Sequence, residues 1–212
     1  MSNLYHKIPG LYKREEQKPF NLIEGVYREP ELELLKDIEW TFTEKVDGTN
    51  IRIIWDGHNV VFGGRTENAQ IPSRLVTKLN ELFMGARVEQ VFEQVFGESK
   101  AILFGEGYGA KIQKGGGNYS ETQEFVLFDV KVGWWYLKRE DVEDVASKFS
   151  LKVVPIIHTG NLESGVELVK SGLQSSWGDF IAEGLVAKPS IELFNRKGDR
   201  IITKIKHEDF KS

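Results

Sequence analysis

The chain has 212 residues, a formal net charge of −4 and 40% hydrophobic residues, a composition typical of a soluble globular protein with a sizeable core. It contains no cysteine, which excludes disulfides, zinc–thiolate sites and a cysteine nucleophile within this sequence. No segment approaches the ~18 uninterrupted apolar residues of a membrane span, and the N-terminal residues are polar, so we expect a cytoplasmic protein with no membrane partner.

Short runs of alternating or β-branched apolar residues predict eight strands. In chain order these strands cover residues 38–45, 50–55, 59–63, 101–105, 124–131, 152–158, 184–188 and 200–206. Asp56-Gly57 supplies a turn between the second and third strands, which makes them a hairpin.

Apolar residues at helical spacing predict two helices between these groups of strands. The first covers 75–83 after the start signal Pro72-Ser73, and the second covers 88–96 and stops at Gly97. Residues 139–149 and 163–171 are weaker helix candidates, and the glycine-rich Lys114–Asn118 is typical of a flexible loop. Strand clusters with helices packed outside them indicate an α+β fold, here expected as a single domain over residues 1–212.

The sequence Glu44-Lys45-Val46-Asp47-Gly48-Thr49-Asn50 lies between two predicted strands. A lysine at a strand end, next to an aspartate and a glycine, is placed where a ligand can reach it, and Gly48 permits a close backbone approach. A lysine acts as a nucleophile only when its amine is neutral. Taken alone, this pattern is more often a charged surface turn.

Four further patterns follow in order along the chain. They are Gly105-Glu106-Gly107, Phe128-Asp129, Glu183-Gly184-Leu185-Val186-Ala187-Lys188 and Lys204-Ile205-Lys206. Alternation along a strand puts the last two lysines on one face. A buried glutamate and two like charges side by side are costly unless something anionic satisfies them, and a nucleoside triphosphate with a divalent cation would do so.

The ordered patterns K-x-D-G, G-E-G, F-D, E-G-x-V-x-K and K-x-K resemble the signature of the covalent nucleotidyltransferases, which comprise DNA ligases, RNA ligases and mRNA capping enzymes. The resemblance covers residues 39–206 and is nearest to RNA ligases of the type 2 group. Asn50 after the lysine motif, Arg65 in Gly64-Arg65-Thr66 and Pro189 after Lys188 carry that finer likeness. The resemblance also favours a phage-type protein, and we expect it in the cytoplasm of a bacterium or of a phage-infected host.

The resemblance implies an ATP-grasp-like adenylation domain with antiparallel sheets flanked by helices. It further implies an ATP-dependent RNA ligase that joins 5′-phosphate and 3′-hydroxyl ends through a lysyl-AMP intermediate and an adenylated polynucleotide. The expected cofactors are ATP and Mg²⁺ or Mn²⁺, and the expected partner is RNA, including nicked duplexes.

Residue by residue, the resemblance makes Lys45 the group that takes up AMP, with Asp47 and Glu183 as the metal site. It assigns charge neutralisation of the phosphates to three lysines, Lys188, Lys204 and Lys206.

Nucleotide recognition is implied for five other side chains or their backbones. Asn50 and Arg65 would hold the reactive phosphate, and Glu106 would bind the ribose hydroxyls. Phe128 would stack on adenine, although a place in the core is also open, and Glu44 would mark the adenine edge through its backbone.

The chain departs from the family pattern by ending shortly after K-x-K, so we expect no C-terminal OB-fold. An accessory protein, or the N-terminal extension of residues 1–38, could compensate. Lys111–Tyr119 could touch a nucleic-acid backbone or form a mobile solvent loop. Trp134-Trp135 are expected in the core, in preference to a nucleic-acid surface.

Three alternatives stay open. The chain could be a minimal ATP-dependent DNA ligase or a capping enzyme that uses GTP, the latter less favoured because Thr49-Asn50 and Lys188-Pro189 suit ligases better. It could also be a catalytically inactive nucleotide- or nucleic-acid-binding module, which would form no covalent adduct.

Overall fold

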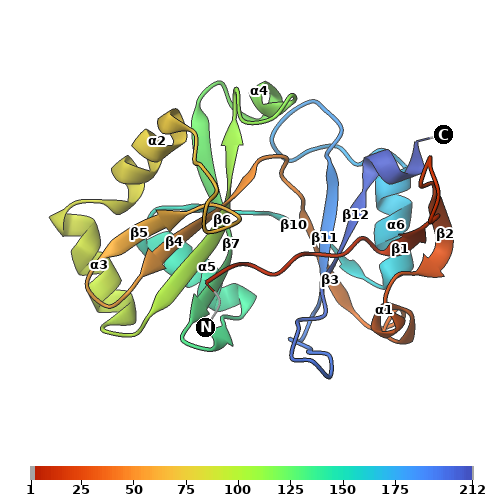
Figure 1. Cartoon of the computed structure of the whole chain (residues 1–212), viewed down its shortest axis with the longest axis horizontal. Coiled ribbons are helices and arrows are strands. Elements are labelled where there is room, and N and C mark those ends of the chain that lie inside the picture. Colours follow the sequence, from red (N-terminus) through yellow and green to blue (C-terminus); the bar gives the residue numbers. More distant parts are fainter. Residues whose placement is uncertain (1–2, 212) are drawn as a thin grey trace. The chain divides into compact units, whose positions relative to one another are not determined.

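The computed structural model describes residues 3–211 and confirms the α+β class, with antiparallel sheets flanked by helices (Figure 1). The contacts divide the chain into two compact units. Unit 1 contains Asp47–Val154 together with the described residues up to Tyr5, and unit 2 contains His6–Val46 and the chain from Pro155 onwards. That the two units form one folding domain stays a prediction.

Unit 1 is built on a six-stranded sheet in the order β5-β4-β6-β7-β8, with β9 beside β7. All neighbours are antiparallel except the β7–β9 pair. The bounds are β4 Thr49–Trp55, β5 Val60–Gly63, β6 Ala101–Gly109, β7 Gln123–Val132, β8 Trp135–Tyr136 and β9 Lys152–Val153.

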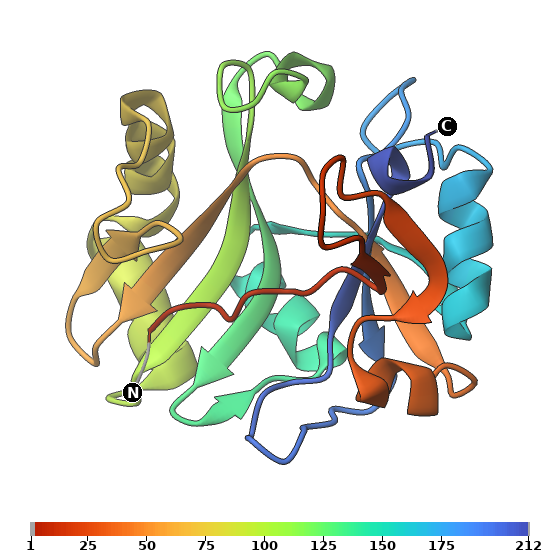
Figure 2. The same cartoon turned by 45° about the vertical axis from the view of Figure 1, so that its right-hand side comes forward.

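One face of this sheet forms the main core of unit 1. Strand residues such as Ile51, Ile53 and Leu103 pack there against three helices, α2 Ser73–Phe83, α3 Ala86–Phe96 and α5 Arg139–Lys148. The helix α3 ends where Gly97 takes a φ of 55°, as the sequence predicts. The short helix α4, Gly116–Tyr119, lies at one end of the long β6–β7 pair (Figure 2).

Unit 2 is built on a four-stranded antiparallel sheet in the order β10-β3-β11-β12. The strands are β3 Trp40–Glu44, β10 Ile156–Gly160, β11 Gly184–Pro189 and β12 Thr203–Lys206. The helix α6, Leu162–Lys170, buries Leu162, Val166 and Val169 against Phe42 and Leu185 of the sheet. This packing leaves the opposite face of the sheet for polar side chains.

The N-terminal part of unit 2 carries three elements that the sequence patterns did not predict. They are the hairpin strands β1 Tyr12–Arg14 and β2 Leu22–Tyr27 and the helix α1 Pro30–Leu34. Gly10 forms a parallel bridge with Lys204, the Leu11 amide donates to the Lys204 carbonyl at 3.1 Å, and the Lys204 amide donates to the Pro9 carbonyl at 3.0 Å. This segment therefore runs beside the strand that carries K-x-K, which continues into the 3₁₀ helix η1, His207–Phe210.

Three local predictions are wrong. The strand expected at 152–158 is broken at Val154-Pro155 into β9 and β10, and the strand expected at 200–206 forms only from Thr203. The loop expected at 114–118 contains the start of α4, in which Gly116 is buried.

Trp134 and Trp135 are exposed by 72% and 78%, not buried as predicted, because Trp134 lies in the turn after β7 and Trp135 is the first residue of β8. A hairpin tip has no layer above it to cover large side chains, whatever their hydrophobicity.

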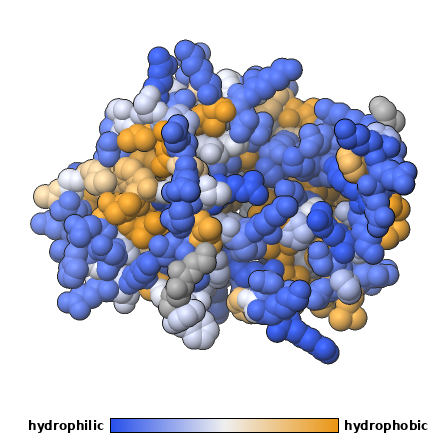
Figure 3. Space-filling model, in the orientation of Figure 1, coloured by the Kyte–Doolittle hydropathy of each residue, from blue (hydrophilic) through white to orange (hydrophobic). Residues whose placement is uncertain are grey.

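Hydrophobic side chains also reach the surface of unit 1 at Val61 and Met84. Figure 3 shows hydrophobic surface over the part of the unit that carries β5, α2 and α3. Within residues 3–211, no helix is both long and apolar enough to cross a membrane.

Candidate functional site

The lysine motif is divided between the two units. Glu44, at the end of β3, and Lys45 belong to unit 2, whereas Asp47 and the residues up to Asn50 at the start of β4 belong to unit 1. The predicted site residues are therefore described in two sets.

In unit 2, Lys45 and Lys206 lie in one row across the sheet, with Gly184 between them. Gly184 opposes Lys206 in the β11–β12 register, and its carbonyl accepts from the Lys45 amide at 2.9 Å. A Cβ on Gly184 would approach the Ile205 carbonyl oxygen to 2.0 Å, and the residue's φ is 153°, so this position requires glycine. The glycine permits this close approach of the two strands.

Glu183 joins the two ammonium groups. Its Oε2 lies 2.6 Å from Nζ of Lys45, and its Oε1 lies 3.2 Å from Nζ of Lys206. Glu208 contributes a second carboxylate, 2.9 Å from Nζ of Lys206. Although burial lowers it, the pKa of Lys206 is raised from its ordinary value by the hydrogen bond to Glu208 and by the charge of Glu183. Lys206 is therefore a permanent cation beside Lys45.

Lys188 and Lys204 lie on the same face of the sheet as these residues. Leu185, Ala187 and Ile205 point into the core, so the residues that alternate with them point away from it. The structure thus brings together the four predicted lysines of unit 2 on the face opposite α6. The expectation that K-x-K presents both lysines on one face is confirmed.

Glu44 is only 1% exposed and uses its side chain within unit 2. Its carboxylate accepts from the Ser175 hydroxyl at 2.6 Å and from the Ser176 amide at 2.8 Å. These bonds fix the loop that leads from α6 towards Glu183. The backbone role of Glu44 at the adenine edge stays a prediction.

In unit 1, the segment that precedes β4 is held by hydrogen bonds at Asp47 and Gly48. The Asp47 amide donates to the Tyr119 hydroxyl at 3.3 Å, and Gln113 Nε2 donates to the Gly48 carbonyl at 2.9 Å. A Cβ on Gly48 would come within 2.2 Å of the Gly107 carbonyl oxygen. Gly48 therefore permits the close approach that the sequence led us to expect, and Gln113 is a contact that no sequence pattern signalled.

Asn50 and Glu106 face each other directly across β4 and β6, so their side chains share the sheet face away from the helices. Asn50 Oδ1 is buried and has no hydrogen-bond partner among the described residues. An unpaired buried polar atom costs on the order of 1–3 kcal/mol. Such an atom indicates a position where a ligand forms the missing hydrogen bond.

Phe128 is the extra residue of a bulge in β7, because the register shifts between Phe104, which pairs with Asp129, and Gly105, which pairs with Leu127. It is half-buried, and its ring meets that of Tyr5 edge-on, with centroids 5.1 Å apart. The adenine-stacking role of Phe128 stays a prediction.

Arg65 is exposed on the loop after β5, and the buried Arg52 holds that loop. Arg52 donates from Nε to the Gly64 carbonyl at 2.7 Å and from Nη2 to the Thr66 carbonyl at 3.4 Å, and its Nη1 lies 3.1 Å from a carboxylate oxygen of Glu67. Sequence reasoning missed Arg52. The available signal was a cation between Ile51 and Ile53, since a charge inside a strand must find acceptors.

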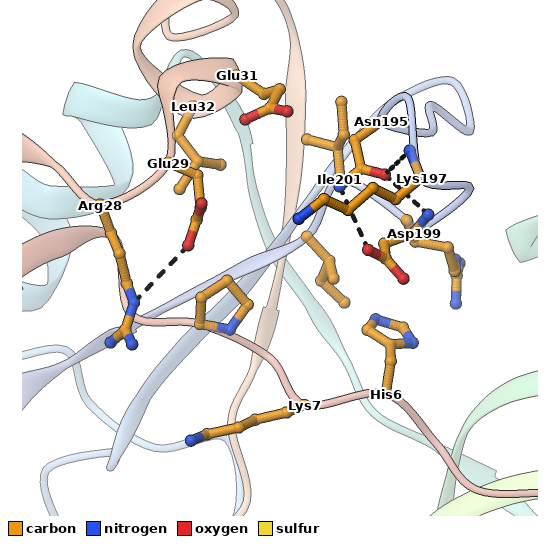
Figure 4. Close-up of a pocket in the computed structure, with 13 residues that line it drawn as sticks. His6, Lys7, Arg28, Glu29, Glu31, Leu32, Asn195, Lys197, Asp199 and Ile201 are labelled. Atoms are coloured by element: carbon orange, nitrogen blue, oxygen red, sulfur yellow. Dashed lines mark hydrogen bonds and ion pairs between the residues drawn. The ribbon is translucent and has the colours of Figure 1, made fainter.

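A separate pocket of about 410 Å³ lies within unit 2 (Figure 4). Basic and acidic side chains line it together, among them Lys7, Arg28, Lys197, Glu29 and Asp199. None of the predicted site residues lines it, and its mixed charge favours no single class of ligand.

No cluster of three or more His, Cys, Asp or Glu side chains that could hold a metal occurs within residues 3–211. The two predicted metal residues, Glu183 and Asp47, each offer a carboxylate. Carboxylates outside such a cluster fit Mg²⁺ or Mn²⁺ bound largely through substrate phosphates and water, and they do not fit a metal held by protein ligands alone.

The fold is similar to that of Naegleria gruberi RNA ligase. A variant of that ligase with ATP and Mn matches at a TM-score of 0.64 and 20% identity, over 96% of this chain and 60% of that one. A second variant with AMP and Mn gives 0.63 and 19%, over 97% and 60%, and the ligase with PPi gives 0.64 and 20%, over 97% and 60%. This chain thus spans about 60% of the length of these ligases.

The structural likeness defines the class as the nucleotidyltransferase fold of RNA ligases. The RNA ligase family model matches residues 38–206, so the chain belongs to the RNA ligase family. No curated protein matches the sequence. The family predicted from the five motifs is confirmed.

Proposed function

We propose that this chain is an ATP-dependent RNA ligase that joins a 5′-phosphate to a 3′-hydroxyl, with Lys45 as the residue that carries AMP. The observation that supports this most directly is the Lys45–Glu183–Lys206 arrangement in a member of the RNA ligase family. In addition, the solved ligases of this fold were obtained with ATP, AMP and PPi.

In the first step, Nζ of Lys45 loses a proton and attacks the α-phosphorus of ATP. The N–P bond forms as the P–O bond to pyrophosphate breaks. Glu183 Oε2, at 2.6 Å from Nζ, is an acceptor for the departing proton. Lys206 stays protonated and stabilises the negative charge that gathers on the phosphoryl oxygens.

In the second step, an oxygen of the polynucleotide 5′-phosphate attacks the same phosphorus, and the N–P bond to Lys45 breaks. In the third, the 3′-hydroxyl attacks the activated 5′-phosphate and AMP leaves. Lys188 and Lys204, on the same sheet face, neutralise phosphate charge. Catalysis of this kind rests on positioning and charge.

Unit 1 supplies nucleotide recognition in this proposal. Glu106 accepts hydrogen bonds from the ribose hydroxyls, Phe128 stacks on adenine, and Asn50 and Arg65 hold the reactive phosphate. The unpaired, buried Oδ1 of Asn50 supports a ligand on this sheet face. Glu183 and Asp47 would hold Mg²⁺ or Mn²⁺, which when bound would neutralise charge on the triphosphate.

The test is the intact mass of the protein after incubation with ATP and Mg²⁺. We expect a gain of one AMP that maps to Lys45 and is reversed by pyrophosphate. Lys45→Ala should abolish the gain. Lys36→Ala is the matched control, because Lys36 is an exposed lysine of the same unit just before β3. Labelling of Lys45→Ala would overturn the assignment of the lysine.

A nick with an adenylated 5′ end separates the later steps from the first. If wild-type protein seals this nick but gains no AMP from ATP, the ligase assignment stands and self-adenylation requires another component, such as an accessory protein. If it does neither, the chain is a binding module. Parallel nicks with RNA and DNA 3′-hydroxyl strands test the minimal DNA ligase alternative, since a preference for RNA would come from contacts to the 2′-hydroxyl.

A further inference from the structure

The segment Lys111–Tyr119 of unit 1 is fixed to the backbone of the lysine motif. Gln113 bonds to the Gly48 carbonyl at 2.9 Å and Tyr119 to the Asp47 amide at 3.3 Å. Asp47 is only two residues from Lys45, a reach of at most about 7 Å along the chain. The point at which this segment is attached, the Asp47 amide, therefore stays within that reach of the Lys45 backbone.

The glycines of this segment reflect close packing. A Cβ on Gly116 would approach the Gly109 carbonyl oxygen to 2.0 Å, so the start of α4 lies directly on the end of β6. Tyr119 is buried, and its ring lies 6.2 Å from that of Tyr108. The Ala110 amide donates to the Ser120 carbonyl at 2.9 Å, which closes the segment at its base. The segment is thus a fixed platform.

Two exposed lysines, Lys111 and Lys114, flank Gln113 on this platform. Within the described chain, no carboxylate forms an ion pair with either of them. On β7, Glu124 is paired with Lys78 at 2.9 Å. Figure 3 shows hydrophilic surface over the region of α4. The platform therefore presents two cations without local neutralisation.

Lys111 also has a φ of 68°, the left-handed region in which a non-glycine residue is uncommon. A glycine or asparagine would adopt this conformation at lower cost. Strain of this kind is characteristic of functional positions, where a particular side chain is needed at a particular place.

We infer that Lys111 and Lys114 bind the phosphate backbone of the polynucleotide substrate beside the end that receives AMP. The inference rests on the proposed function. The ATP phosphates already have Lys188, Lys204 and Lys206 in that proposal, so Lys111 and Lys114 serve the second substrate. Lysine suits this role because it contacts a phosphate as a point charge and reads no sequence.

The test compares Lys111→Asn/Lys114→Gln with wild type in two assays. The first is binding of a fluorescently labelled nicked RNA duplex at several salt concentrations. We expect a roughly tenfold weaker Kd at low salt and a log Kd against log salt slope that falls by about one per lysine. The second is AMP uptake from ATP, measured by intact mass, which we expect to be unchanged.

The matched control is Lys100→Gln/Lys138→Gln. Both are exposed lysines of unit 1, and Lys100 immediately precedes Ala101, at the end of β6 opposite the platform. We expect this variant to bind RNA with the wild-type salt slope. Lys111→Asn alone should also raise the unfolding midpoint, because asparagine adopts this backbone conformation at lower cost. Weaker RNA binding in a more stable variant could not be explained by misfolding.

An unchanged salt slope in Lys111→Asn/Lys114→Gln would overturn the inference, as would an equal loss in the control variant or a failure of wild-type protein to bind nicked RNA. Loss of AMP uptake in Lys111→Asn/Lys114→Gln would also overturn it, because the lysines would then serve ATP. Failure of wild-type protein to take up AMP bears on the proposed function and leaves the RNA-binding result readable.

Discussion

The candidate polar groups of the two units differ in whether they have partners within the fold. On the sheet of unit 2, Lys45, Glu183 and Lys206 satisfy one another through ion pairs of 2.6 and 3.2 Å. On the sheet of unit 1, Asn50 has a buried oxygen without a partner, and Arg65 is exposed on a loop. Unit 2 holds a charge network that is complete without ligand, whereas unit 1 holds a polar atom that lacks a partner.

This difference indicates what each unit contributes to stability and to function. In unit 2 a carboxylate between two ammonium groups keeps like charges from destabilising the fold, so the reactive residues also support each other. In unit 1 the fold bears the cost of a polar atom that only a ligand would satisfy. Substitutions in the two units should therefore change stability and activity in different combinations.

The largest effect should come from Glu183→Gln. Removal of the carboxylate leaves Lys45 without its proton acceptor and places two cations side by side, so we expect AMP uptake to fall by about 100-fold or more. Glu208→Gln is the control, because Glu208 also contacts Lys206 but not Lys45. Rates of AMP uptake measure the difference, and equal rates in the two variants would contradict the role of Glu183.

The next largest effect should be a loss of stability in Arg52→Ala that Arg65→Ala does not show. Arg52→Ala removes a buried guanidinium and leaves the Gly64 and Thr66 carbonyls unpaired, so we expect a loss of about 2–4 kcal/mol in the free energy of unfolding. Arg65→Ala should change stability by less than about 0.5 kcal/mol. Urea denaturation measures both.

Rates of AMP uptake provide a second comparison of the Arg52 and Arg65 variants. Both arginine variants should slow it, Arg65→Ala by loss of the phosphate contact and Arg52→Ala by displacement of the loop. Arg52→Lys should not restore stability, because an ammonium group cannot reproduce the planar fork of donors. Full stability in that variant would show that charge alone holds the loop.

The smallest loss of stability should come from Asn50→Leu. The substitution replaces a half-buried amide, whose buried oxygen is unpaired, with an apolar side chain of similar size, so we expect the free energy of unfolding to stay level or rise by up to about 1 kcal/mol. AMP uptake should nevertheless fall. A clear loss of stability would mean that Asn50 has a structural role, and the contrast between the units would fail at this residue.

Much of the fold could be predicted from the sequence because alternation and helical spacing are local. The strands around Lys45 and the helices that end at Phe83 and Phe96 lie close to their predicted positions. Prediction failed where burial depends on distant partners. Trp134 is hydrophobic yet lies at a hairpin tip, and Arg52 is charged yet buried under a loop that follows the next strand.

The sequence by itself determined the family, the order of the five motifs and the placement of Lys204 and Lys206 on one face, because all three depend on residue identity and on alternation along a strand. Only the tertiary structure decided that Glu183 lies between Lys45 and Lys206, and that Gln113 and Tyr119 hold the lysine motif. Those contacts join residues far apart in the chain, and strand pairing and packing, not local propensity, bring them together.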